Sequence, residues 1–203
     1  MINGVAKRAR KEVSHTYYEP GFLRKHRNLK VIQRVLKFGL RGNISSDFPS
    51  PHPAKDLFAV RQLRSFLDDC AEVGMTTKFH TRLLEWVPIL LDYEHVRVVL
   101  PVDDFCGIDP SMALELRETY PHRVRVRAMI HNEAALERYI WADVITPFHV
   151  PQGGMTGWMR ENGFQIMSHR TNAFKRISEA YPTKVCCQTH GCETCQVGCG
   201  FGS

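Results

Sequence analysis

Short runs rich in β-branched residues alternate with segments of helical periodicity from residue 35 onward, and this alternation constrains the fold more than any other feature. A chain built from such units forms a parallel sheet whose strands are connected by helices. We count six units followed by one last run. The strands are expected at residues 35–40, 75–79, 95–101, 123–130, 143–147, 164–168 and 183–187. The sequence therefore predicts an α/β fold.

Glycine, proline and capping residues mark the ends of the helices expected between these strands. Gly74 is typical of a helix C-terminus, and Asp109-Pro110 and Asn132 are typical of helix starts. Helices are expected over residues 54–73 and 80–93, from residue 109, and over 132–141 and 171–181. Cys70 falls on the apolar stripe of the first helix, which indicates a small core residue rather than a ligand.

Two parallel architectures fit this order, an open doubly wound sheet and a barrel. The connections are short, and links between parallel strands are right-handed almost without exception. Since the chain has neither a GxGxxG motif nor a P-loop, we favour a partial (βα)6-type parallel barrel with a C-terminal cysteine-rich metal segment. The predicted organisation is a basic extension at 1–34, the barrel at 35–185 and the cysteine segment at 186–203.

Titratable residues gather where the strands are expected to end. In parallel α/β folds the functional groups lie at the carboxyl ends of the strands, because the loops there converge. An Asp pair, a Lys and a His can divide proton transfer and substrate clamping between them. The catalytic candidates are therefore Lys78, Asp103, Asp104 and His131. Helix capping and turn chemistry select the same residue types, so that explanation stays open for each position.

Five of the seven cysteines lie within residues 186–199. No stretch approaches the roughly 20 apolar residues that span a bilayer, and the N-terminus lacks the apolar core of a signal peptide. We therefore expect no membrane partner and a cytoplasmic location. Structural disulfides are rare in that reducing compartment, so metal or redox chemistry is the better explanation of the cysteines.

The spacing Cys187-x4-Cys192-x2-Cys195-x3-Cys199 predicts a metal site. Four thiolates this close in sequence can surround one ion or hold a cluster. The run is nearer to bacterial ferredoxin spacing than to paired zinc knuckles, which favours an iron–sulfur cluster of the 4Fe–4S type. His190 and Cys186 could replace a ligand, so zinc is the alternative. Because the last strand leads into this segment, we expect it on the same edge of the sheet as the catalytic candidates.

Two stretches carry a resemblance to a known family. The phrase MTTKFHTRLLEWVPILLDYEHVRVVLPVDD resembles a strand-helix-strand unit of the radical S-adenosylmethionine superfamily, and CCQTHGCETCQVGCG resembles the ending of small phage- and plasmid-encoded proteins with that barrel. The resemblance implies a partial (βα) barrel and a segment, Arg41-Gly42-Asn43, that contacts the cofactor. The chain lacks the family's Cys-x3-Cys-x2-Cys loop, since residues 35–69 contain no cysteine, and S-adenosylmethionine is therefore the less expected cofactor.

Positive charge is concentrated in residues 1–34, where nine Lys or Arg stand against two Glu, within a chain of net charge +6. Interleaved aromatics, Tyr17, Tyr18 and Phe22, could stack on bases beside phosphate contacts. Three functions are consistent with these features. They are a metal-binding enzyme that acts on a nucleotide or nucleic acid, a non-enzymatic nucleic-acid-binding protein with a zinc knuckle and a basic arm, and a scaffold for protein contacts. A solvated arm without a specific partner is the plain alternative for the basic stretch.

Overall fold

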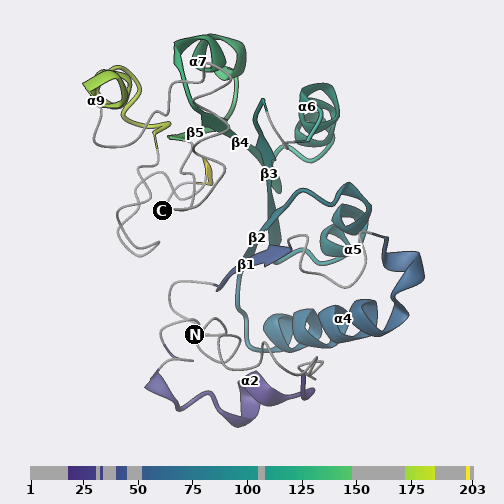
Figure 1. The fold of residues 1–203 in the computed structure, drawn as a ribbon. Coiled ribbons are helices and arrows are strands. Elements are labelled where there is room, and N and C mark those ends of the chain that lie inside the picture. Colours follow the sequence, from purple (N-terminus) through teal and green to yellow (C-terminus); the bar gives the residue numbers. More distant parts are fainter. Residues whose placement is uncertain are drawn as a thin grey trace, which may run out of the picture.

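The computed structural model of the chain describes residues 18–30, 33, 40–44, 52–104, 108–147, 172–185 and 200–201. Within them the strands form one five-stranded sheet in the order β1-β2-β3-β4-β5, and every neighbouring pair is parallel (Figure 1). The strands are β1 Leu40–Ile44, β2 Thr77–Thr81, β3 Val96–Val102, β4 Val124–Ile130 and β5 Val144–Pro147. The predicted parallel α/β fold is confirmed.

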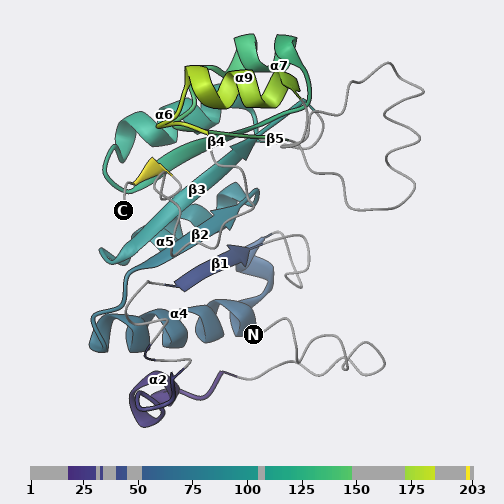
Figure 2. The same cartoon turned by 90° about the vertical axis from the view of Figure 1, so that its left-hand side faces the viewer.

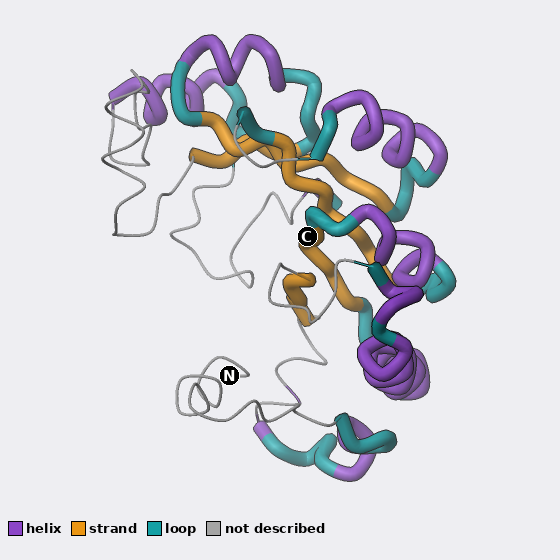
Figure 3. Tube along the Cα trace, turned by 45° about the vertical axis from the view of Figure 1, so that its right-hand side comes forward, coloured by secondary structure: helices purple, strands orange, loops and turns teal. Residues whose placement is uncertain are grey.

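The helices that connect the strands lie on one face of the sheet (Figure 3). They are η1 Pro53–Lys55, α4 Leu57–Glu72, η2 Leu84–Trp86, α5 Val87–Leu91, α6 Pro110–Thr119, α7 Glu133–Tyr139 and α9 Asn172–Ala180. Strands added in sequence order with right-handed connections put every helix on the same side, whereas a doubly wound sheet reverses direction and covers both faces. We call the side that carries the helices the outer face and the opposite side the inner face (Figure 2).

The hydrophobic core lies between the outer face and the helices. Every second residue of β3, from Val96 to Val102, has no exposed surface, and Trp86, Leu67 and Leu90 are equally buried in the helical layer. Each such side chain contributes about 1.5–3 kcal/mol when it leaves water. Alternate residues of each strand thus face this core, and the residues between them lie on the inner face.

Helix ends form as the capping residues predict. Asp109 accepts hydrogen bonds from the backbone N–H groups of Ser111 and Met112, and Asn132 accepts one from Ala135. Gly74 has a φ of 68° after α4, a conformation that costs glycine little. Its N–H donates to the carbonyl of Ala71, and the Met75 N–H donates to that of Cys70, which is the Schellman pattern.

Strand positions differ from the predictions at the first two strands. Because Met75 belongs to the helix cap, β2 begins at Thr77, two residues later than expected. Residues 40–44 pair with 77–81, so Arg41, Gly42 and Asn43 lie inside β1 rather than in a loop after it. Tertiary pairing overrides the low strand propensity of Gly and Asn at these positions.

The last predicted strand begins beside β5. Val185 forms a parallel bridge with Ile145, and the Ile145 N–H donates to the Lys184 carbonyl at 2.8 Å. The predicted strand at 164–168 lies outside the described residues. Closure of the sheet into a barrel stays a prediction.

Residues 18–25 pack against α4, and this segment includes the short helix α2 (Phe22–Lys25). Asp69 of α4 accepts hydrogen bonds from the Tyr18 hydroxyl at 2.6 Å and from the Gly21 N–H at 2.8 Å. The Tyr18 ring lies edge-on to Phe66, with the ring centroids 5.3 Å apart. Part of the predicted N-terminal extension is therefore attached to the sheet domain through α4.

A small second cluster completes this attachment. Leu23, Cys70 and Met75 are buried together. Burial raises the pKa of the Cys70 thiol to about 12, so the reactive thiolate is scarce at neutral pH. The prediction that Cys70 is a core residue is confirmed.

Replacing Asp69 with alanine should destabilise the protein by about 2–3 kcal/mol, because two hydrogen bonds to a charged group are lost and their donors stay partly buried. Urea unfolding measures this change. Glu72→Ala is the matched control on the same helix: Glu72 pairs with Arg24 at 3.6 Å, with both side chains more than half exposed. That pair is worth about 0–1 kcal/mol. Equal losses in the two variants would contradict the account of Asp69.

Candidate functional site

The inner face of the sheet carries basic residues on β2, β3 and β4. Lys78 and His80 alternate with buried outer-face residues along β2, whereas on β4 partly exposed Arg125 and Met129 share this face with buried Arg127. In the register of the sheet Lys78 lies beside Arg97, Val99 beside Arg125, and Pro101 beside Arg127. The cationic inner face is defined here as Lys78, His80, Arg97, Arg125 and Arg127.

An acidic and histidine-containing cluster lies at the carboxyl ends of β3 and β4. Asp103 and Asp104 follow β3 directly, and His131 follows β4. The side chain of Asp103 is fully buried, that of Asp104 is 15% exposed, and His131 is 1% exposed. Three of the four predicted catalytic candidates are therefore brought together, as expected of neighbouring parallel strands.

His131 and Asp104 form the centre of this cluster. The His131 Nε2 lies 3.5 Å from Asp104 Oδ2. The other oxygen of Asp104 accepts a hydrogen bond from the Tyr139 hydroxyl at 2.8 Å and one from Arg138. Two residues of α7 thus hold the carboxylate in place, and the carboxylate faces the imidazole.

Burial determines the charge state of His131. It lowers the pKa of the imidazole below its usual range, the nearby Arg138 acts in the same direction, and Asp104 and Asp103 oppose them. The neutral form is therefore favoured at neutral pH. A neutral imidazole beside a carboxylate can accept a proton and is stabilised once it carries one.

Arg82 is a member of the cluster that sequence reasoning missed. Its Nη2 lies 3.3 Å from Asp103 Oδ2 and 3.9 Å from the sulfur of Met129, so its side chain reaches from β2 across to β4. Arg82 is the residue just after β2, but the sequence does not mark it as such because the predicted strand ends at residue 79 and β2 ends at Thr81. Its exposed guanidinium group can hold an anionic substrate group above buried Asp103.

Lys78 does not belong to this cluster. The sequence analysis puts it at a strand end, but it is the second residue of β2 and lies toward the amino ends of the strands. Its ammonium group is 6.0 Å from the ring centroid of Phe201. A catalytic role for Lys78 stays a prediction, but not as a neighbour of Asp103, Asp104 and His131.

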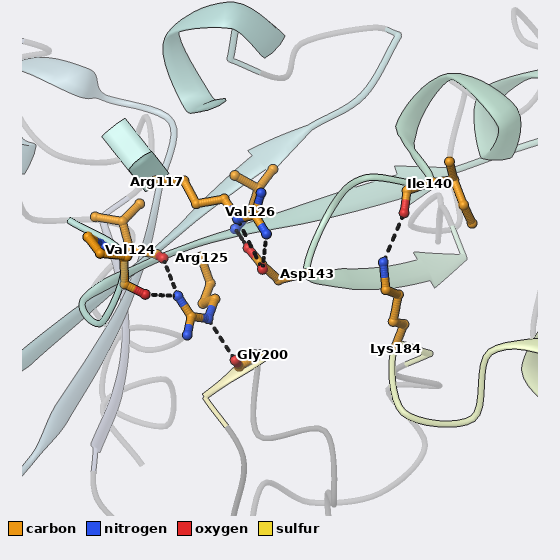
Figure 4. Close-up of polar contacts among 9 residues, drawn as sticks. Arg117, Val124, Arg125, Val126, Ile140, Asp143, Lys184 and Gly200 are labelled. Carbon is orange, nitrogen blue, oxygen red and sulfur yellow. Dashed lines mark hydrogen bonds and ion pairs between the residues drawn. The ribbon is translucent and has the colours of Figure 1, made fainter. Parts of the chain in front are cut away.

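The C-terminal residues 200–201 contact the amino end of the inner face. The Arg125 Nε donates to the Gly200 carbonyl at 2.8 Å (Figure 4), and the Phe201 ring centroid is 5.1 Å from the Arg125 guanidinium carbon. Gly200 has a φ of 87°, and an added Cβ would lie 3.1 Å from side-chain atoms of Asp143 and Val144. Only glycine fits this contact without strain.

Asp143 organises the surroundings of that contact. Its carboxylate accepts hydrogen bonds from Arg117 at 3.1 Å and from the Val126 N–H at 2.9 Å (Figure 4). It therefore joins α6, β4 and the start of β5 at the place where Gly200 packs.

The predicted metal ligands Cys187, Cys192, Cys195 and Cys199 lie outside the described residues. In the part of the chain that the structure describes, no three His, Cys, Asp or Glu side chains converge to hold a metal ion. No helix in that part is long and apolar enough to cross a membrane. The predicted cofactor contacts Arg41, Gly42 and Asn43 lie beside Lys78, Phe79 and His80 in the register of the sheet.

Fold and site together define an α/β protein with a parallel sheet in sequence order and a buried acid–base pair at the carboxyl edge of that sheet. Comparison of the chain with models of known protein families gives no match, and comparisons with curated proteins and with solved structures give none either.

The free energy of unfolding should fall as the pH is lowered from about 6.5, because the unfolded chain binds a proton at His131 before the folded protein does. The loss ends once the pH is below the lowered pKa of the folded state. Urea unfolding at several pH values measures this dependence. His95 acts in the same direction, since burial and then Arg123 and Arg97 lower its pKa.

His131→Gln should make this pH dependence shallower, whereas His122→Gln, at an exposed position before β4, should leave it unchanged. An unaltered slope in the His131 variant would contradict the described environment of the imidazole.

Proposed function

We propose that the protein is a metal- or iron–sulfur-binding enzyme of the partial (βα)-barrel type that acts on a nucleotide or nucleic acid. The observation that carries the enzymatic part is the pair formed by buried His131 and Asp104. In parallel α/β folds this edge of the sheet is the usual place for chemistry.

In this proposal the residues of the carboxyl-edge cluster have separate roles in the reaction. His131, neutral at rest, accepts a proton from the substrate, and Asp104 stabilises the imidazolium that results. Tyr139 and Arg138 keep Asp104 oriented. Arg82 binds an anionic group of the substrate, and Asp103 positions Arg82.

The sheet supports the barrel part of the proposal. Its strands follow one another in sequence order, its helices lie on one face, and its inner face carries polar residues that a barrel would enclose. Val185 beside Ile145 begins the next strand position. Further strands added there would continue the curve toward closure.

Both flanks of the cysteine segment support a metal site. Val185, just before it, pairs with Ile145, and Gly200, just after it, packs against Val144. Both residues that flank the 14-residue segment 186–199 are therefore held beside β5. A segment fixed at both ends that contains five cysteines is well suited to enclosing an ion. Cys187, Cys192, Cys195 and Cys199 would hold an iron–sulfur cluster or, alternatively, zinc.

Anaerobically purified protein should contain iron and sulfide and absorb in the visible range, because thiolate-to-iron charge transfer colours such clusters. A colourless protein with one zinc would support the structural alternative. Cys195→Ser should lose the metal, whereas Cys70→Ala, at the buried core cysteine, should keep it. Wild-type protein without either metal would contradict the metal site.

Mass spectrometry of a nucleotide mixture incubated with the metal-loaded protein, with and without S-adenosylmethionine, tests the enzymatic part. A new product should form, and His131→Gln should lower its rate by about 10²–10⁴-fold through loss of acid–base catalysis. Asp104→Asn should lower the rate less. His122→Gln is the control. Full activity of His131→Gln would exclude the acid–base role.

A further inference from the structure

We propose that the exposed cations of residues 24–30, which we call the basic segment, bind the phosphate backbone of a nucleic acid beside α4. The inference rests on the proposed function, because it takes a nucleic acid rather than a free nucleotide as the substrate class. It concerns binding alone, so it can be tested without turnover.

Positive charge is dense and exposed in the basic segment. Residues 24–30 hold four cations and no carboxylate, which gives them a formal charge of +4 in a chain of net charge +6. The cations are Arg24, Lys25, Arg27 and Lys30, and all four are exposed. Side chains of this kind release counterions when they neutralise phosphates, which supplies most of the affinity of sequence-independent binding. The segment is therefore complementary to a nucleic-acid backbone.

The ion pairs of the basic segment are weak. Glu72 of α4 lies 3.6 Å from Arg24, and Glu19 lies 3.2 Å from Lys25. All four side chains in these pairs are more than half exposed. Ion pairs this exposed contribute little to stability. Phosphate oxygens can therefore replace the two carboxylates.

Attachment to α4 gives the basic segment a fixed backbone. Asp69 accepts hydrogen bonds from the Tyr18 hydroxyl at 2.6 Å and from the Gly21 N–H at 2.8 Å, and Leu23 is only 5% exposed. Figures 1 and 2 show α2 at the lower margin of the domain, beyond α4. Cations on a backbone that is already held lose less freedom on binding than those of a solvated arm.

The aromatic residues next to these cations are engaged in packing. The Tyr18 ring lies edge-on to Phe66, and Phe22 packs against the cluster that contains Leu23. His26 lies against Phe22, with the ring centroids 4.5 Å apart. These rings stabilise the attachment, so we infer contact with phosphates rather than stacking on bases. Such contacts carry no sequence information.

The same packing argues against a membrane surface as the partner. A helix that lies in a membrane interface offers a broad apolar face to the lipid. Here Leu23 and Phe22 of α2 are used against α4. Within residues 18–30 the large apolar side chain that is exposed is Leu29, at 51%. Single exposed apolar residues are common on protein surfaces.

The position of the basic segment favours a polymer over a free nucleotide. It follows Gly21, which is bonded to Asp69 near the end of α4, and α4 leads into the start of β2. His131 and Asp104 lie at the opposite, carboxyl edge of the sheet. A strand of seven residues, as in β3, spans about 23 Å. A ligand that contacts both places must be longer than this, which an oligonucleotide is and a single nucleotide is not.

Fluorescence anisotropy tests the inference with a labelled single strand of about 20 nucleotides and its duplex, titrated with the full-length protein between about 50 and 200 mM salt. Both should bind, with affinities that fall with salt. Arg27→Gln combined with Lys30→Gln should weaken binding at least about tenfold and reduce the slope of log K against log salt by about 2.

The matched control is Lys175→Gln combined with Arg176→Gln. These two exposed cations of α9 lie at the opposite margin of the domain from α2 (Figure 2), and their loss changes the net charge by the same amount. Affinity and salt slope should stay unchanged in this variant. Equal weakening in the two double variants would show a response to net charge alone and would overturn the inference.

Leu23→Ala tests whether attachment to α4 matters, because it keeps every charge. It should weaken binding at least about threefold without changing the salt slope, since the segment must then be ordered on binding. Circular dichroism establishes whether this variant folds; if it does not, Tyr18→Phe, which removes one hydrogen bond to Asp69, takes its place. Unchanged affinity in the folded variant would contradict the fixed arrangement.

Further outcomes separate this inference from the proposed function. His131→Gln should bind the oligonucleotide normally, so loss of turnover with intact binding concerns the catalytic site only. Absence of oligonucleotide binding by the wild-type protein, or a preference for one sequence that the Arg27 and Lys30 variant removes, would overturn the inference. Tighter binding to phosphatidylserine vesicles than to the oligonucleotide would overturn it as well.

Discussion

The parallel hydrogen-bonded ladder, built in strict sequence order, is the constraint on which the rest of the structure depends. Each right-handed connection returns its helix to the same side, so the residues of the main hydrophobic core lie on the outer face. Within the described strands, the inner face carries charged residues beside buried ones such as Val99 and Val144. In a parallel sheet that has helices on both faces, both faces are buried and the strand residues are mostly apolar. Because the winding leaves this face without helices in the described part of the chain, β4 can carry Arg125 and Arg127 at alternate positions on it.

The same ladder assembles the site at the carboxyl edge. Register aligns the ends of β3 and β4, which brings Asp104 and His131 to ion-pair distance although they are far apart in sequence. The helix that follows β4 supplies Tyr139 and Arg138, and Asn132 caps this helix next to His131. Capping and catalysis are thus not competing explanations at this edge. Asn132 satisfies the backbone, and its neighbour His131 faces Asp104.

Local signals in the sequence predicted most of the fold, and long-range contacts account for what they missed. Periodicity, Gly74, Asp109 and Asn132 act within one or two helical turns, so the helices and their caps could be anticipated. The Schellman bond from Met75 to Cys70 moved the start of β2 to Thr77, and this shift made Lys78 the second residue of the strand and placed Arg82 just after its end. The position of Gly200 against Asp143 and Val144 joins residues more than fifty positions apart, and no local pattern indicates it.

Positive charge on the inner face also favours the proposed metal site. Four thiolates around Zn²⁺ give a site of net charge about −2, and thiolate-bound iron–sulfur clusters are likewise anionic. The cysteine segment 186–199 is followed by Gly200, whose carbonyl accepts a hydrogen bond from Arg125, and the Lys78 ammonium group lies 6.0 Å from the ring centroid of Phe201. In the proposed function, these two cations would stabilise negative charge on a metal site close to this end of the segment.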